Sequence, residues 1–204
     1  MDVHAAQPLA AEDQARAQWY GLISRLFHAA PDATLLDAIA SAAAGTEDDG
    51  AGSSFHAAWR DLQTACAGAD AEKVRTEFEA LFVGVGKALV TPYTSAYAAA
   101  HAPDRHLVAL RERFGEWGLG RRDGIFETED HVSAVCDGMR WSIEHGRSLA
   151  EQRDYFSDYV DAAMVSFCAA INQAPNANFY RSAAALALAF HAVEKDAFDM
   201  HTET

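Results

Sequence analysis

Residues 77–97 read EFEALFVGVGKALVTPYTSAY, and this stretch is the most informative in the chain. Phe78, Leu81 and Phe82 recur at the spacing of one helix face. The two glycines of the GVGK that follows end the helical pattern, and the proline of TPY restarts the chain in an extended or turn conformation. We therefore expect this segment to present aromatic and backbone groups at one defined place.

The rest of the chain carries the same helical periodicity, with apolar residues recurring at intervals of three and four rather than two. No alternating strand pattern persists, and loops are expected at GTEDDGAGSS and WGLGRRDGIFET. The sequence thus predicts an all-α fold, with residues 1–204 forming one globular helical domain of about eight or more helices. The predicted helices run from about Glu12 to Ala30, from Asp32 past Ile39, from about Ser54 past Leu62, from about Asp70 to Phe82, and over 101–115, 129–145, 149–174 and 178–200.

Composition and cysteine usage indicate a protein that folds without covalent crosslinks. Half of the 204 residues are hydrophobic, which supplies a sizeable core. Cys66, Cys136 and Cys168 stand far apart and form no CxxC pair, so we predict buried, reduced thiols. The first twenty residues lack the basic flank and apolar core of a secretory signal, and no run of about 18 apolar residues occurs. We expect a cytoplasmic protein that does not span a membrane.

The formal charge of -14 at pH 7 restricts the choice of partner. A nucleic-acid-binding protein neutralises phosphates with clustered lysine and arginine, so this class is excluded. Many cytosolic proteins are acidic for solubility alone. The same charge would also favour a cationic partner, at least in the rate of encounter.

The motifs of several enzyme classes are absent from the sequence. A phosphate-binding GxxxxGK[ST] loop would need glycine at Leu81 and a hydroxyl residue at Ala88, and the GVGK follows a helical pattern rather than a strand. No HExxH or GxSxG motif occurs. Glu127 and His131 stand four residues apart, but no further metal ligands can be assigned to them. We therefore expect no catalytic activity and no metal or cofactor of its own.

Two short segments combine residues suited to recognition. In the first, Pro92 fixes the backbone while Tyr93 and Ser95 can pack or form hydrogen bonds. The second, ETEDH at residues 127–131, precedes a long helical pattern. A functional interpretation of either segment competes with a purely structural one.

Helix formation alone explains most of the ETEDH segment. Thr128 is the predicted N-cap, and Glu129 and Asp130 would interact favourably with the positive end of the helix dipole. His131 is less well explained, because histidine is a mediocre helix former. Beside Asp130 it offers a donor and acceptor pair at a helix end.

Together, these segments resemble the TorD/DmsD family of molybdoenzyme maturation chaperones, also called redox enzyme maturation proteins. The family pattern is approximately an acidic residue, an aromatic residue, two others, Leu-Phe, a glycine turn and then Pro-Tyr-Glu-Ser-x-Tyr. The corresponding residues are Glu77-Phe78-x-x-Leu81-Phe82-x-Gly84-x-Gly86 and Pro92-Tyr93-Thr94-Ser95-x-Tyr97, and the second family mark is Asp130-His131.

The chain also departs from the family pattern at three places. Val85 replaces the proline that is usual in the glycine turn, and Thr94 replaces the usual acid. The segment Val135-Cys136-Asp137 differs from the acid-leucine pattern that commonly follows Asp-His. These differences concern the choice of partner rather than the family.

The resemblance implies an all-helical chaperone without catalytic turnover. Such a protein binds the N-terminal twin-arginine leader of a molybdenum-cofactor oxidoreductase, assists cofactor insertion and prevents premature export. The implied clients are of the formate dehydrogenase or the dimethyl sulfoxide or trimethylamine oxide reductase type. An acidic protein suits a leader with paired arginines, while the apolar part of the leader needs a hydrophobic groove.

Seven residues are carried over as leader-binding candidates, and the two family marks are expected to lie side by side. The expected apolar groove is lined by Leu81, Phe82, Pro92 and Tyr93, with Ser95 nearby and with Asp130 and His131 at its polar end. We expect Asp130→Ala and His131→Ala to weaken leader binding without unfolding the protein. Leu81 and Phe82 can equally be core residues, because a Leu-Phe pair on a helix face is most often buried.

Two alternative functions stay open at the level of sequence. One is a NarJ-like chaperone that assembles a membrane-associated nitrate reductase. The other is a nucleotide-binding regulatory protein, suggested by the GVGK. A monomer is compatible with the sequence, and so is a dimer in which helices exchange through the irregular links.

Overall fold

Helices make up 77% of the described residues and no strand occurs among them, so the predicted all-α fold is confirmed. The computed structural model describes residues 9–43, 51–84, 88–99, 101–120 and 127–200. Two segments, η1 and η2, have π-helical hydrogen bonding. The elements are α1 (Ala11–His28), α2 (Ala33–Ser41), α3 (Ala51–Ala67), α4 (Ala71–Phe78), η1 (Glu79–Val83), α5 (Ser95–Ala98), α6 (Pro103–Glu116), α7 (Val132–Glu144), α8 (Leu149–Tyr155), η2 (Phe156–Asp161), α9 (Ala162–Gln173) and α10 (Phe179–Met200).

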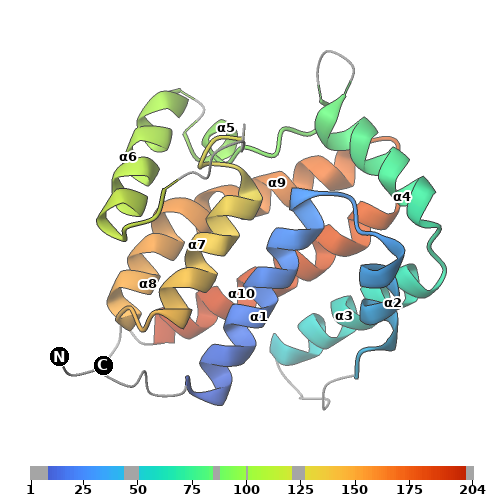
Figure 1. The fold of residues 1–204 in the computed structure, drawn as a ribbon, viewed down its shortest axis with the longest axis horizontal. Coiled ribbons are helices and arrows are strands. Elements are labelled where there is room, and N and C mark those ends of the chain that lie inside the picture. Colours follow the sequence, from blue (N-terminus) through green and yellow to red (C-terminus); the bar gives the residue numbers. More distant parts are fainter. Residues whose placement is uncertain (1–8, 44–50, 85–87, 100, 121–126, 201–204) are drawn as a thin grey trace.

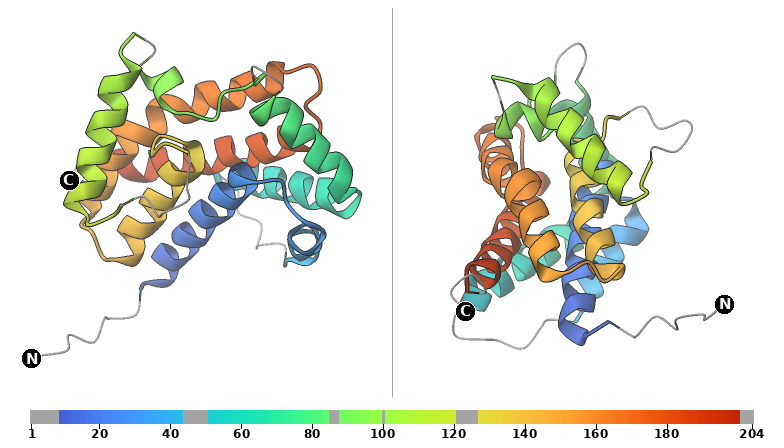
Figure 2. Two further views of the ribbon diagram at one scale, coloured as in Figure 1. Left: turned by 45° about the horizontal axis from the view of Figure 1, so that its top comes forward. Right: turned by 90° about the vertical axis from the view of Figure 1, so that its left-hand side faces the viewer.

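The helices form two layers (Figure 1). In one layer α1 packs along α7, and in the other α10 packs against α3 and α9. The right-hand view of Figure 2 separates α1 and α7 from α9 and α10, and in the left-hand view α6 lies along an outer edge. None of the described helices is long and apolar enough to cross a bilayer.

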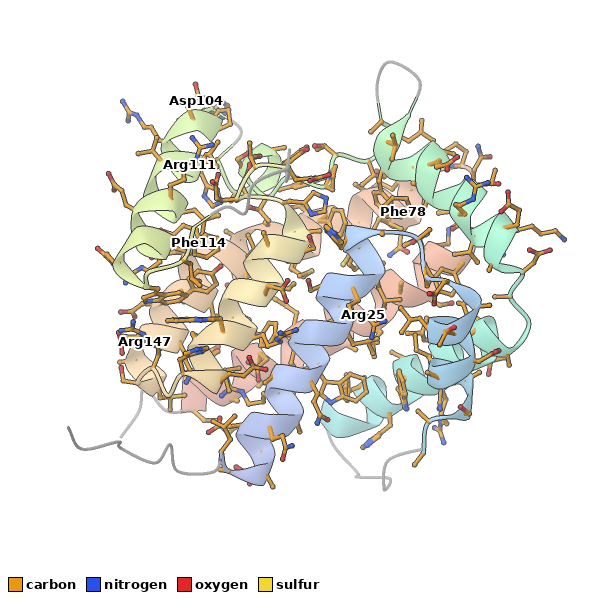
Figure 3. The ribbon with its side chains drawn as sticks, viewed as in Figure 1. Arg25, Phe78, Asp104, Arg111, Phe114 and Arg147 are labelled. Carbon is orange, nitrogen blue, oxygen red and sulfur yellow. The ribbon has the colours of Figure 1, made fainter. Side chains whose placement is uncertain are left out.

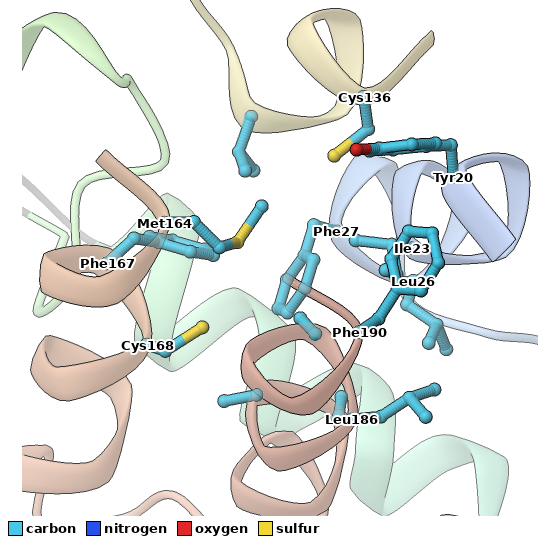
Figure 4. Packing of buried hydrophobic residues seen from close by; sticks show 14 of the residues in the cluster. Tyr20, Ile23, Leu26, Phe27, Cys136, Met164, Phe167, Cys168, Leu186 and Phe190 are labelled. Carbon is cyan, nitrogen blue, oxygen red and sulfur yellow. The ribbon is translucent and has the colours of Figure 1, made fainter. Parts of the chain in front are cut away.

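The core lies between these two layers. Phe27 of α1 points toward α9 and α10 (Figure 4) and packs edge-on against Phe167, with ring centroids 5.0 Å apart. Ala183, Ala184 and Ala187 are buried on α10, where their small side chains allow neighbouring helices to approach. Burial of apolar surface contributes about 25 cal/mol per Å², so this contact region is the main source of stability.

The cysteines belong to this core. Cys66, Cys136 and Cys168 are all free and buried, which confirms their predicted burial. Burial raises the pKa of Cys66 to about 11 and that of Cys168 to about 12, and it raises the pKa of Cys136 further. Because the thiolate is the reactive form, these side chains act as small apolar groups.

Several helices start at capping side chains that the sequence identifies. The Asp32 carboxylate accepts a hydrogen bond from Leu35 N at 2.8 Å and caps α2, and Asp70 caps α4 in the same way. Ser148 and Glu151 form a reciprocal capping box at the start of α8. The predicted starts of the helices near residues 32, 70 and 149 are therefore confirmed.

The segment at residues 77–97 also contributes a helix cap, which the spacing of its apolar residues does not reveal. The Glu77 carboxylate accepts hydrogen bonds from the backbone amides of Asn178, Phe179 and Tyr180 at 2.8, 3.1 and 2.9 Å. These amides open α10 and have no partner within their own helix. Glu77 of α4 therefore fixes the N-terminus of a helix about a hundred residues away in the chain.

Replacing this cap should measurably destabilise the protein. We expect Glu77→Ala to lower the free energy of unfolding by about 1–2 kcal/mol, because it leaves three α10 amides without their acceptor and removes a charge at the helix dipole. Urea denaturation monitored by circular dichroism measures this change. Glu79→Ala is the matched control, since Glu79 is exposed two residues further along the chain and its side chain pairs only with Arg75 among the described contacts. Equal losses in the two variants would contradict the capping role.

Candidate functional site

The two segments that carry the family marks meet in space. Tyr93 and His131 pair in an isolated antiparallel bridge. Val132 N donates a hydrogen bond to Pro92 O at 2.8 Å, and Thr94 N donates one to Asp130 O at 2.7 Å. The short stretch before α5 is therefore fixed by backbone hydrogen bonds to the start of α7.

Asp130 is the buried centre of this junction, with only 3% of its surface exposed. Its carboxylate accepts hydrogen bonds from the hydroxyl groups of Ser95 and Thr128. The Thr94 hydroxyl donates to the Asp130 carbonyl at 3.0 Å and lies 3.3 Å from His106 Nε2. Asp130 thus links α5, α6 and the segment before α7.

His131 is a neutral hydrogen-bond donor at the same junction. Its Nδ1 accepts from the backbone amide of Ser133 at 3.2 Å, which places the ring proton on Nε2. The ring lies edge-on to Tyr93 and to His28, with centroids 5.6 and 6.5 Å apart. Burial, together with His28, lowers the pKa of His131 to about 4 against the opposing effect of nearby carboxylates.

The predicted N-cap at Thr128 is wrong. His131 is the N-cap, and α7 begins at Val132 rather than near Glu129. Two contacts explain the shift: the Thr128 hydroxyl is bonded to the Asp130 carboxylate, and the Asp130 carbonyl accepts from Thr94. Residues 128–130 are therefore held in a turn by contacts with the segment before α5.

A cleft of about 570 Å³ opens beside His131 between α6 and α7. Figure 3 shows Arg111 and Phe114 on α6, the helix that forms one side of this cleft. Arg111 Nε donates to Glu129 Oε2 at 2.7 Å across the cleft. The lining combines apolar and acidic groups, among them Phe114, Leu119, Trp141, Glu127, Glu129, Asp137 and Glu144.

Three clefts adjoin one another along α1 and α7. The second has a volume of about 580 Å³ and shares Arg140 and Glu144 with the first. The third, of about 310 Å³, shares His28, Asp137 and Arg140 with the first. These shared residues indicate one extended surface, which we call the α1–α7 groove.

The structure does not bring the seven predicted site residues into one cleft, and His131 is the one among them that lines the cleft between α6 and α7. Leu81 and Phe82 lie in the core, with 0% and 7% of their surface exposed, and they line none of the clefts described above. Tyr93, Ser95 and Asp130 line a separate cleft of about 520 Å³, and Thr128 lies between that cleft and the one beside His131. Pro92 is buried, and its carbonyl supports α7.

The structure also bears on the possible metal ligands and on the GVGK. No group of three or more histidine, cysteine or acidic residues in the described part of the chain could hold a metal ion. Of the GVGK, residues 85–87 lie outside the described residues, and Gly84 has φ of 62°, which ends η1. The groove residues on α1 and α7, such as Arg140, were not anticipated because no short motif marks them.

The comparisons with known proteins agree with this geometry. The sequence model of the nitrate reductase delta subunit family matches residues 48–173, more than half of the chain. The chain belongs to this family. The nitrate reductase delta subunit family comprises NarJ/TorD-type chaperones, so the resemblance to redox enzyme maturation proteins is confirmed, and the chain belongs to a family of maturation chaperones.

One solved structure supports the fold. It is that of an Archaeoglobus fulgidus protein described as a redox enzyme maturation protein, with a TM-score of 0.53 and 15% sequence identity. The alignment covers 95% of this chain and 99% of that one, so the helical arrangement is shared over nearly the full length. No curated protein matches the sequence.

The buried histidine of this delta subunit family member should make stability depend on pH. The pKa of His131 is about 4 in the folded chain and about 6.5 when unfolded, so the unfolded state binds the extra proton between these values. The contribution of about 3 kcal/mol is fully present above pH 6.5 and is lost as the pH falls through 4.

His131→Asn tests this dependence, because asparagine preserves an N-cap acceptor but does not titrate. We expect the stability of the wild type to fall more steeply than that of the variant between pH 6.5 and 4. Thermal denaturation across this range measures both slopes. Parallel stability curves would show that folding does not lower the pKa of His131.

Proposed function

We propose that this chaperone binds the twin-arginine leader of a molybdenum-cofactor oxidoreductase in the α1–α7 groove. It would hold the client until the cofactor is inserted and so prevent premature export. The observation that carries the proposal is the junction of the two family marks, where Pro92–Ser95 and Asp130–His131 lock together beside a cleft rich in carboxylates.

The lining of the groove suits a leader peptide. Arginine binds carboxylates through two parallel hydrogen bonds, and acidic side chains occur along α7 and on the link before it. Phe114, Leu119 and Trp141 offer apolar contacts for the hydrophobic part of a leader. The charge of -14 adds long-range attraction for a cationic peptide.

His131 would bind the backbone of the peptide rather than an arginine side chain. Because its imidazole is neutral near pH 7 and its proton lies on Nε2, it can donate to a backbone carbonyl without repelling arginine. The buried Asp130 positions this residue rather than meeting the peptide. Asp130→Ala is therefore a poor probe of binding, since it would leave the hydroxyl groups of Ser95 and Thr128 without their acceptor.

Titration calorimetry with a synthetic twin-arginine leader peptide tests the proposal. We expect the wild type to bind this peptide at least about tenfold more tightly than one with two lysines in place of the arginines, because lysine lacks the planar fork. Glu127→Gln should weaken binding about two- to fivefold. Glu112→Gln is the control, since Glu112 is exposed on α6 outside the cleft lining.

Two results would overturn this proposal. One is equal affinity for the arginine and lysine peptides. The other is the absence of binding to a folded wild-type chain.

The matched family model favours a second candidate, a NarJ-like chaperone that assembles a nitrate reductase. Such a protein would need the body of the enzyme in addition to a leader-like segment. Affinity purification from the native host, followed by mass spectrometry, separates the candidates by the identity of the captured oxidoreductase. Capture of a nitrate reductase catalytic subunit without a twin-arginine leader would favour the second candidate.

A further inference from the structure

Arg140 lies at the meeting point of the three clefts of the α1–α7 groove. It stands near the middle of α7, between the carboxylates of Asp137 and Glu144. Its guanidinium lies 3.5 Å from Asp137 Oδ1 and 3.3 Å from Glu144 Oε1. Asp137 and Glu144 are two helical turns apart in α7, a rise of about 10.5 Å along the helix axis, and both line the cleft beside His131.

The contacts of Arg140 are longer than those of the buried ion pair between Arg16 and Glu194. Arg16 meets Glu194 at 2.7 and 2.9 Å, distances typical of charge-assisted hydrogen bonds. Arg140 has longer contacts, and its side chain is 43% exposed, with Asp137 and Glu144 at 54% and 40%. Ion pairs of this exposed kind contribute at most about 1 kcal/mol each, so a competing guanidinium can displace the side chain.

The facing surface of α1 leaves room for a guanidinium group. A Cβ atom at Gly21 would lie 3.1 Å from Arg140 Cδ and 3.2 Å from its Nη1, which is closer than most such contacts. Glycine at this position therefore lets an arginine side chain lie against the helix. The surface of α1 at Gly21 and the adjacent surface of α7 therefore fit an arginine side chain between them.

His131 provides an independent sign that a ligand belongs here. The residue is 6% exposed and lines the same cleft as Asp137, Arg140 and Glu144. Its Nδ1 is engaged by Ser133, whereas its Nε2 proton has no hydrogen-bond acceptor among the described residues. The Nε2 atom is open to the cleft, so a peptide carbonyl bound there can accept its proton.

We propose that Arg140 is a resident competitor: in the free chaperone it occupies the carboxylates of Asp137 and Glu144, and an arginine of the client leader displaces it. This inference rests on the proposed function. Client binding then exchanges one guanidinium for another at the same carboxylates. Arg140 thus lowers the affinity for the leader and favours release once the client has matured.

Calorimetry with the twin-arginine and twin-lysine peptides tests the competition. Arg140→Gln should bind the arginine peptide about two- to fivefold more tightly than the wild type, because both carboxylates are then free. Asp137→Asn combined with Glu144→Gln should bind it about tenfold more weakly. Adding Arg140→Gln to that double variant should change nothing further, since the competitor has lost its targets. Arg153→Gln on α8 is the control, because Arg153 lies outside the groove and pairs only with Asp154 among the described contacts.

The possible outcomes are distinct. If the wild type prefers the arginine peptide but Arg140→Gln binds it no more tightly, the competition is overturned and the proposed function stands. Tighter binding by Arg140→Gln in both carboxylate backgrounds would also overturn it, since the effect would not depend on Asp137 and Glu144. If the wild type binds neither peptide or does not distinguish them, the proposed function fails, and this inference fails with it.

Discussion

Glu194→Gln is expected to lower the free energy of unfolding by about 3–5 kcal/mol, because it removes the buried counter-charge of Arg16 and leaves this largely buried side chain with only the more exposed Asp13 carboxylate. Glu194 is 2% exposed on α10 and receives two hydrogen bonds from Arg16 of α1, at 2.7 and 2.9 Å. The Tyr20 hydroxyl donates to the same carboxylate at 3.0 Å. Arg16 also donates to Gln152 of α8 at 3.1 Å, so three helices meet at one charge pair.

The charge state of Arg16 supports this expectation. Burial opposes the charged form of its guanidinium, yet the hydrogen bonds from Arg16 to the Glu194 carboxylate raise the pKa of Arg16 above its ordinary value. Arg16 stays charged in Glu194→Gln as well, because a guanidinium keeps its proton in proteins even without that partner. Urea denaturation measures the loss, with Asp196→Asn as the control because Asp196 is exposed on the same helix. A loss no larger than that of the control would show that the pair contributes little.

Gly138→Ala is expected to destabilise the protein by about 2–3 kcal/mol and to disturb the cleft beside His131. A Cβ atom at Gly138 would lie 2.8 Å from Phe114 Cε1 and closer still to the hydroxyl oxygen of Tyr155. Tyr155 is fully buried and donates to Val135 O at 3.1 Å, so its ring has little freedom to move. The added methyl group must push Phe114, and α6 with it, away from α7.

Gly115→Ala is the matched control for this prediction. Gly115 lies in α6, and a Cβ atom there meets nothing within 4 Å. Alanine is a better helix former than glycine, so Gly115→Ala should be neutral or stabilise by up to about 1 kcal/mol. Thermal denaturation of both variants, with binding of the twin-arginine peptide measured alongside, checks the pair. Unchanged stability and binding in Gly138→Ala would contradict the close approach of the Phe114 and Tyr155 rings to Gly138.

Periodicity and capping residues predict most of the fold because both act locally. Asp32 and Asp70 cap the helices that they were expected to start, and the apolar stripe of α1 faces the core. The π-helical segments η1 and η2 were not predicted, since they leave the apolar spacing almost unchanged. The cap that Glu77 provides for α10 could not be predicted either, because its partners lie about a hundred residues away.

Only part of the candidate site was predictable, because contacts between distant segments of the chain leave no local signal in the sequence. The family marks locate Pro92–Ser95 and Asp130–His131, and the structure brings them together. The helical spacing of Leu81 and Phe82 does not distinguish a core position from a groove position. Both residues were predicted to line the groove, and both are buried. In the sequence, the spacing of Asp137, Arg140 and Glu144 is typical of any solvent-exposed helix face. Only the packing of α1 against α7 reveals the groove.

Photo-crosslinking of a twin-arginine leader peptide to the wild-type chain tests the central claim most directly. The peptide carries a crosslinker next to the arginine pair, and mass spectrometry identifies the attached residues. We predict crosslinks to α7 and α1 around Asp137, Arg140 and His28, and a marked loss of these crosslinks with the twin-lysine peptide. Crosslinks confined to the opposite layer, on α3 and α10, would contradict a leader site in the α1–α7 groove.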